Sequence, residues 1–73
     1  MNELEKLKKL LHHWKVHNDE HAEVYREWSD KTRSLGYEDL SKILSTLHLE
    51  TKKLDGLFEE AIKKTVDESG VPT

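Results

Sequence analysis

The chain has 73 residues and no cysteine, and its 12 basic and 15 acidic residues give a net charge of −3. A single domain of this size buries little surface, so we expect stabilisation by a partner, most simply as a homodimer. The lack of cysteine excludes disulfides and thiolate metal sites and favours the cytoplasm, and the interleaved charges offer no basic stripe for nucleic acid.

The first predicted element is a helix over residues 3–35. The mixed charges of residues 1–6 lead into no long apolar run, which argues against a signal peptide or a membrane span. Apolar or large residues then recur at steps of three and four: Leu4, Leu7, Leu11, Trp14, Asn18, His21, Tyr25, Trp28, Thr32 and Leu35. This heptad frame predicts one helix about 45 Å long. The alternative is a break at Asn18, as the N-cap of a new helix, although the frame does not slip there.

The second predicted element is a helix over residues 38–67. Gly36 suits the left-handed position that ends the first helix, and the acidic pair Glu38 and Asp39 suits the start of the next. The second frame consists of Leu40, Leu44, Leu47, Thr51, Leu54, Phe58, Ala61 and Thr65. We therefore expect a single helical-hairpin domain over residues 1–68, with Gly56 on its outer face and a frayed tail over residues 69–73.

Two long helices joined by two or three residues must lie antiparallel, so the predicted fold is an all-α two-helix hairpin. One flank of the hairpin is largely apolar and presents Leu10, His17, Val24, Ile43, Glu50 and Leu57. The opposite flank is largely polar and presents Lys8, Lys15, Ala22, Ser29, Ser41, His48, Asp55 and Ile62. We expect a second hairpin to dock on the apolar flank and form a four-helix bundle.

A histidine cluster is the feature most suggestive of chemistry. Four of the five histidines lie between residues 12 and 21, and His13, His17 and His21 repeat at intervals of four. This spacing places imidazoles on one helical face, where they can share a metal ion. By helical angle His21 falls in the core frame, His17 at the edge facing the partner, and His13 nearer to solvent. In an antiparallel hairpin their layer meets the stretch that contains Glu50.

The sequence therefore predicts a site for a divalent transition metal such as zinc, nickel or iron. The predicted ligands are His13, His17, His21, Glu50 and Glu20, with Asn18 as a hydrogen-bond donor behind them. Two alternatives remain: a purely structural polar layer that sets dimer register, and an interface that responds to histidine protonation. His48 is expected to be solvated on the polar flank.

The segment HWKVHNDEHA at residues 13–22, followed by Tyr25 and Trp28, resembles a group of short helical prokaryotic proteins of uncharacterised function. The resemblance implies a helical hairpin with a histidine-rich first helix, and it brings no activity to transfer. A second comparison is with ferritin-like carboxylate bundles. Those bundles carry Glu three residues before the ligating His, whereas Asn18 stands there before His21, which argues against a di-iron oxidase.

The function expected from these features is a small soluble metal-binding module, acting as a sensor, carrier or accessory protein. The alternative is a structural or interaction hairpin, not an enzyme, whose His/Asn layer sets dimer register or which binds another protein through a helix-in-groove contact. Catalysis has little support, because the sequence has no Ser-His-Asp set, no glycine-rich loop and no H-E-x-x-H motif.

Overall fold

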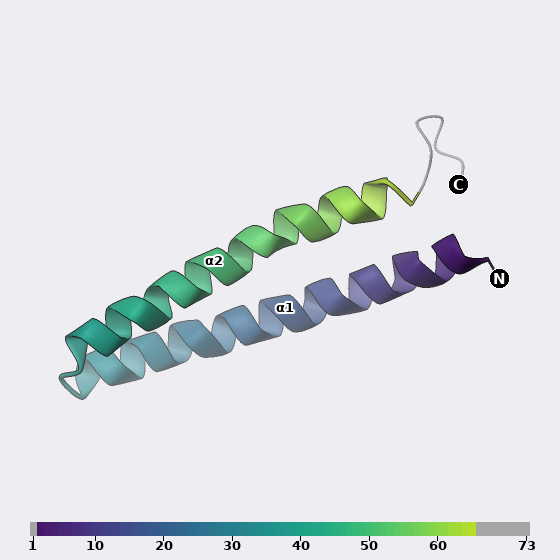
Figure 1. The fold of residues 1–73 in the computed structure, drawn as a ribbon. Helices are drawn as coiled ribbons and strands as arrows, with labels where there is room; N and C mark the ends of the chain where they lie inside the picture. The colour runs from purple at the N-terminus through teal and green to yellow at the C-terminus, as the bar shows by residue number, and fades with distance from the viewer. Residues whose placement is uncertain (1, 66–73) are drawn as a thin grey trace.

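The computed structural model describes residues 2–65 and confirms an all-helical, antiparallel hairpin (Figure 1). Helix α1 spans Glu3–Ser34 without a break at Asn18, and helix α2 spans Glu38–Lys63. The Asn2 side chain accepts a hydrogen bond from the Glu5 backbone N–H at 2.8 Å, which satisfies a free amide at the start of α1. The tail expected at residues 69–73 lies outside the described residues.

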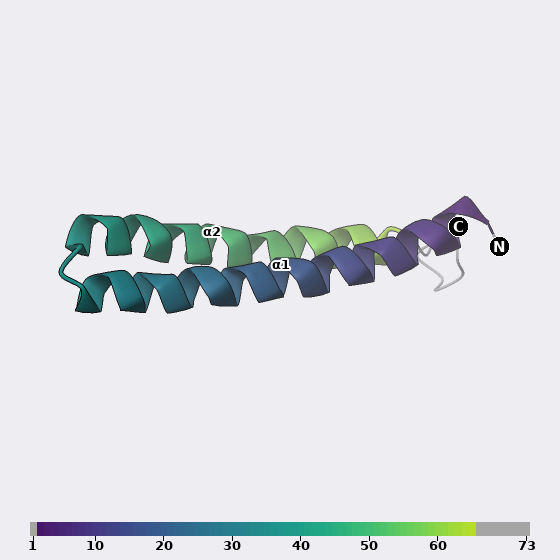
Figure 2. The ribbon, with the colours of Figure 1, turned by 90° about the horizontal axis from the view of Figure 1, so that it is seen from below.

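The turn between the helices is built on Gly36. Its φ of +92° lies in the left-handed region that glycine adopts without strain. The Tyr37 N–H donates to the Thr32 carbonyl at 2.9 Å, and the Gly36 N–H donates to the Arg33 carbonyl at 3.0 Å. These two bonds form a Schellman motif, which ends α1 and reverses the chain within three residues. Figure 2 shows the turn at one end of the hairpin and the N-terminus at the other.

The contact between the helices, called the seam below, consists largely of small and polar side chains. In α1 the buried or half-buried residues are Leu4, Lys8, Leu11, Lys15, Asn18, Asp19, Ala22, Tyr25, Ser29 and Thr32. In α2 they are Ser41, Leu44, His48, Thr51, Asp55, Phe58, Ala61 and Ile62. Ala22, at the centre, is 0% exposed. Small side chains at these positions let the two backbones approach closely.

The seam is not the one that the heptad frame predicted. Half of the frame expected to close the hairpin is exposed, namely Leu7, Trp14, His21, Trp28 and Leu35. The stripe expected to face solvent as the polar flank instead faces α2. The prediction was wrong for this half of the frame, because a two-helix contact has room for one row of large side chains but not for two, and Ala22, Ser29 and Ser41 take the second row.

Hydrogen bonds across the seam replace much of the usual apolar packing. The Ser29 hydroxyl donates to the Ser41 carbonyl at 2.9 Å, and the Ser41 hydroxyl donates to the Ser29 carbonyl at 2.7 Å. His48, which was expected to be solvated, is half-buried, and its Nδ1 lies 2.8 Å from the Ala22 carbonyl oxygen. The carbonyl can only accept, so Nδ1 carries the proton. Within residues 2–65, each buried side-chain nitrogen or oxygen has a partner.

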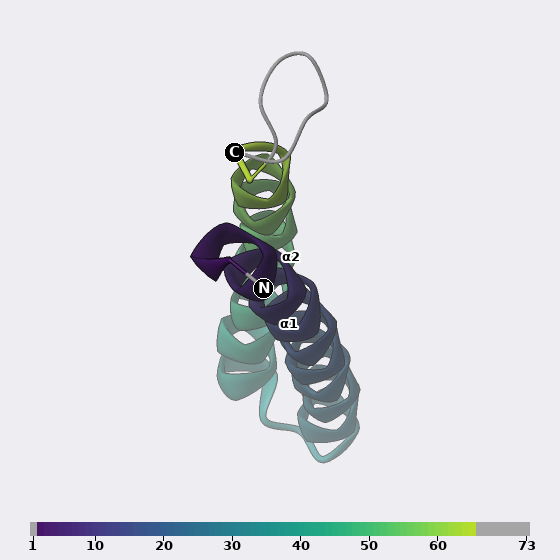
Figure 3. The same cartoon turned by 90° about the vertical axis from the view of Figure 1, so that its right-hand side faces the viewer.

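The described part of the chain is one layer of two helices, as the nearly end-on view in Figure 3 shows. The molecule extends 52 × 20 × 12 Å, so its smallest dimension is about the diameter of one helix. Large side chains on the two broad sides therefore have little to pack against. Neither helix, within residues 2–65, has the length and continuous apolar character needed to cross a bilayer.

Candidate functional site

The largest apolar side chains gather on one broad side of the hairpin, called the open face below. The open face consists of Leu7, Leu10, Trp14, Val24 and Trp28 of α1, Leu35 just after α1, and Leu40, Ile43, Leu47, Leu54 and Leu57 of α2, all of them exposed. Trp14 and Leu57 line one groove of about 360 Å³, which places the two stripes on the same side. An exposed apolar patch of this extent usually marks a binding surface.

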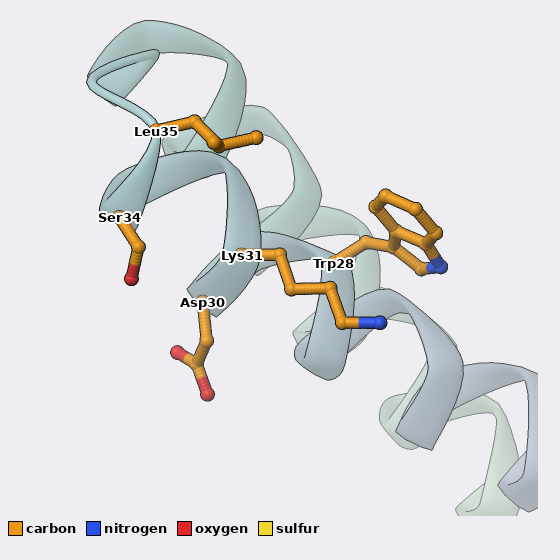
Figure 4. A pocket seen from close by; sticks show the side chains of 5 residues that line it. All are labelled: Trp28, Asp30, Lys31, Ser34 and Leu35. Atoms are coloured by element: carbon orange, nitrogen blue, oxygen red, sulfur yellow. The ribbon is translucent and has the colours of Figure 1, made fainter.

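The turn end of the open face is shown in Figure 4. The side chains of Trp28 and Leu35 reach toward the same side, while Asp30 and Ser34 point away from them. The Lys31 ammonium lies 4.6 Å from the centroid of the Trp28 ring, a distance suited to a cation–π contact. The Lys31 stem thus extends the apolar surface while its charge stays in solvent.

The histidine stripe runs along α1 into the open face. The ring centroids of His13 and His17 are 4.4 Å apart in an edge-on contact, and those of His17 and His21 are 6.5 Å apart. The His21 ring stacks on Tyr25 with centroids 6.3 Å apart. All three histidines are exposed. By helical spacing His17 and His21 continue the row of Trp14 and Val24, so they interrupt an apolar stripe with two imidazoles.

The seam sets the level at which these histidines meet α2. The Asn18 amide donates to the Thr51 carbonyl at 2.7 Å and to the Asp55 carboxylate at 3.1 Å. Residues 18–22 of α1 therefore lie opposite residues 48–55 of α2. Glu50 falls within that stretch, exposed, with its carboxylate 3.0 Å from the Lys53 ammonium.

A single hairpin does not gather the predicted ligands into one site. Among residues 2–65, no three His, Asp or Glu side chains are placed so that they could hold one metal ion. Glu20 is exposed on α1, and the Asn18 amide is engaged by α2. His17, His21 and Glu50 share a level and a side of the hairpin, but further ligands would have to come from outside it.

A charged network lies beside the seam at the same level. The Lys52 ammonium is 2.9 Å from the Asp19 carboxylate and 3.1 Å from the Asp55 carboxylate. Hydrogen bonding to Asp19, then to Asp55, raises the pKa of Lys52. The side-chain interaction with Asp19, then hydrogen bonds from Asn18 and Lys52, holds the pKa of Asp55 below its ordinary value. The Asp55 side chain is 17% exposed, so its bonds to the other helix contribute to the fold.

Acid is expected to weaken the hairpin in part through Asp55. Because its pKa is lower in the folded state than the unfolded value of about 3.9, the carboxylate stabilises the fold above that pH, and this stabilisation is lost as the pH falls through the folded pKa. The Asp55→Asn variant should therefore show a smaller loss of unfolding free energy between about pH 5 and about pH 2. Urea unfolding at fixed protein concentration measures the free energy of unfolding at each pH. Lys42→Gln, an exposed change on the same helix, is the control, and equal pH slopes for Asp55→Asn and the parent would contradict the prediction.

Two residues of the predicted polar flank lie in the seam instead. His48 and Asp55 stand in the predicted polar flank and were expected to face solvent, whereas both bond to α1 across the seam. Their signal was spacing: seven residues apart, they share a stripe with Ser41 and Ile62. A stripe that pairs a serine, a histidine and an aspartate with a small-residue stripe on α1 is typical of a close, hydrogen-bonded helix contact.

Comparison with known protein families gives one match. Residues 7–65 match DUF8180, a domain of unknown function, and the chain belongs to this family. The match covers nearly all of the two helices. Searches of curated proteins and of solved structures find no match to this chain.

Proposed function

We propose that the hairpin is a homodimeric helical module that binds a divalent transition metal through its histidine stripe. One observation carries the proposal: the open face is apolar along both helices and is interrupted at mid-length by His17, His21 and Glu50. A surface that docks on another helical pair would be apolar, and ligands placed at its centre would be shielded from water.

The exposed area supports a dimer. The chain exposes 5637 Å², whereas a compact monomer of this mass would expose about 4700 Å². The excess is close to the roughly 800 Å² that each partner buries in a stable interface. Two hairpins that cover each other's open faces would form a four-helix bundle, with Trp14 and Trp28 in its core.

The metal is argued from the chemistry of the side chains. Neutral imidazole binds zinc, nickel and iron(II) well, and a carboxylate completes many such sites. The 4.4 Å and 6.5 Å spacings along the stripe keep neighbouring rings close enough to converge on one ion after small rotamer changes. A sensor, a carrier and an accessory protein that hands on a metal would each need such a site.

Calorimetric titration tests the metal. Chelator-treated protein titrated with zinc, nickel or iron(II) is expected to bind one of them tightly, and the His17→Ala/His21→Ala variant should lose that binding. His12→Ala removes an exposed imidazole from the same helix and should leave binding unchanged. Parent protein that binds none of these ions would contradict the proposal, and so would a double variant that binds as well as the parent.

A second candidate function is an interaction hairpin without a metal. The observation that favours it is the polar interruption itself, because one polar layer in an apolar interface fixes register and oligomeric state through hydrogen bonds. In that case the His17→Ala/His21→Ala variant would change the oligomeric state in metal-free buffer. Sedimentation equilibrium with a chelator present distinguishes the two functions, since the metal-binding module should remain a dimer in both proteins.

A further inference from the structure

The central residues of the open face of α1 follow a similar order of residue types in both directions from residue 19. Residues at equal distances from that point are Leu10 and Trp28, Trp14 and Val24, and His17 and His21. The open face of α2 is symmetric in the same way about Glu50 and Thr51. Leu47 matches Leu54 and Leu40 matches Ala61 about this point, and Ile43 and Leu57 match about a point half a residue away, at Glu50.

The two centres of symmetry lie at one level of the hairpin. The Asn18 amide touches the Thr51 carbonyl at 2.7 Å, which places residue 19 of α1 beside residues 50 and 51 of α2. A single two-fold axis, perpendicular to the helices at this level, can therefore pass through the centres of symmetry of both α1 and α2. It would stack α1 on α1 and α2 on α2 of a second copy, each pair antiparallel and with the turns at opposite ends.

End-to-end symmetry is what such a stack requires. In it, Leu10 lies beside Trp28 of the second copy and Trp14 beside its Val24, so apolar residues meet on both sides of the axis, whereas Leu7 meets Lys31. A dimer with both turns at the same end would place α1 on α2, and it would need no symmetry within either helix. The arrangement with opposed turns is the one that places His17 and His21 of both copies around one axis.

At the centre of this arrangement the ligands of two copies converge. Resting on the proposed metal-binding function, we infer that the metal ion sits on the two-fold axis of the dimer, held by His17 and His21 of both copies. Four imidazoles form a set suited to zinc or a similar divalent ion. The two Glu50 carboxylates lie at the same level and balance the charge. The site is incomplete in one hairpin, which accounts for the scattered ligands there.

A monomeric variant tests whether the site is shared. Ile43 is 65% exposed in the hairpin, so Ile43→Glu should prevent docking without disturbing the seam. Ser45→Glu adds the same charge on an exposed position two residues along and is the control. With zinc chloride, the parent and Ser45→Glu should bind one ion per two chains. Ile43→Glu should be a helical monomer whose zinc affinity is lower by roughly 100-fold or more, because half of the ligands are gone.

The outcomes separate this inference from the function on which it rests. If monomeric Ile43→Glu binds zinc as tightly as the parent, the site lies within one hairpin; metal binding stands and the shared site is overturned. If the dimeric parent binds no metal, the metal-binding function itself is overturned. Circular dichroism of Ile43→Glu confirms that a loss of binding does not come from unfolding.

A distance measurement tests the opposed turns. The chain has no cysteine, so Ser34→Cys provides a single attachment point for a spin label, and its side chain points away from the open face near the turn (Figure 4). Residue 34 lies fifteen positions from the proposed axis, which predicts a label separation of about 45 Å in the dimer. A separation of roughly 10–20 Å would place both turns at one end and overturn the arrangement.

Discussion

Replacing Ala22 by leucine is expected to lower the free energy of unfolding by about 1–3 kcal/mol. Ala22 is 0% exposed at the centre of the seam, and its carbonyl oxygen accepts a hydrogen bond from the His48 Nδ1 at 2.8 Å. Three further carbon atoms there would force the helices apart and break that hydrogen bond. Thermal unfolding at one fixed protein concentration measures the change, expected as a loss of roughly 4–8 °C per kcal/mol for a chain of this size.

The control for Ala22→Leu is Glu27→Leu, which adds an apolar side chain to an exposed position of the same helix. Its effect should stay within about 0.5 kcal/mol. An unchanged or raised melting temperature in Ala22→Leu would show that the helices do not pack through this residue. The predicted apolar frame would then regain support as the contact within the hairpin.

Replacing Trp14 by alanine is expected to weaken the proposed dimer by about 100-fold or more, because truncating a buried Trp costs about 3–5 kcal/mol. In the lone hairpin this side chain is 44% exposed and lines the groove with Leu54 and Leu57. Its loss should therefore act mainly on association. Sedimentation equilibrium over a range of concentrations gives the dissociation constant for each variant.

Val16→Ala is the matched control for Trp14→Ala. Val16 is 55% exposed on α1 outside the open face, so its truncation should leave the dissociation constant unchanged. A Trp14→Ala chain that associates as tightly as the parent would mean that the open face is not the contact between copies. The dimer would then need a different surface.

The helices and their turn could be predicted from the sequence because their determinants are local. An unbroken repeat of apolar residues without Gly or Pro predicts a long helix, and Gly36 adopts the left-handed conformation expected of it. The antiparallel hairpin then follows from the short connection. Each of these inferences depends on residues that are neighbours along the chain or on one helix.

The pairing of helical faces could not be predicted in the same way. Each helix has two adjacent heptad stripes, one with large residues such as Trp14 and Trp28, the other with small or polar ones such as Ala22 and Ser29. Burial of apolar area favours the first stripe in any one contact. The structure instead uses the small stripe for the close contact within the hairpin and leaves the large one exposed. The apolar pattern along the chain does not show which of two adjacent stripes makes that contact.

The sequence predicted the residue types of the candidate site better than the positions of those residues. His17 and Glu50 were expected on one flank with His21 beside them in the core frame, and the structure places both histidines within an exposed apolar row with Glu50 at their level. His21 was expected inside the hairpin, yet it is exposed, because the seam is formed by the neighbouring stripe. The metal and its ligand set remain predictions that the titrations above test.

The seam's directional bonds also fix alignment. Asn18, Ser29 and His48 each donate to a particular carbonyl on the opposite helix, so sliding one helix past the other would break these three hydrogen bonds. A purely apolar contact would tolerate such a shift of register far better. Substitutions on the open face, to suit a different ion or a different partner helix, should therefore leave the register of the two helices unchanged.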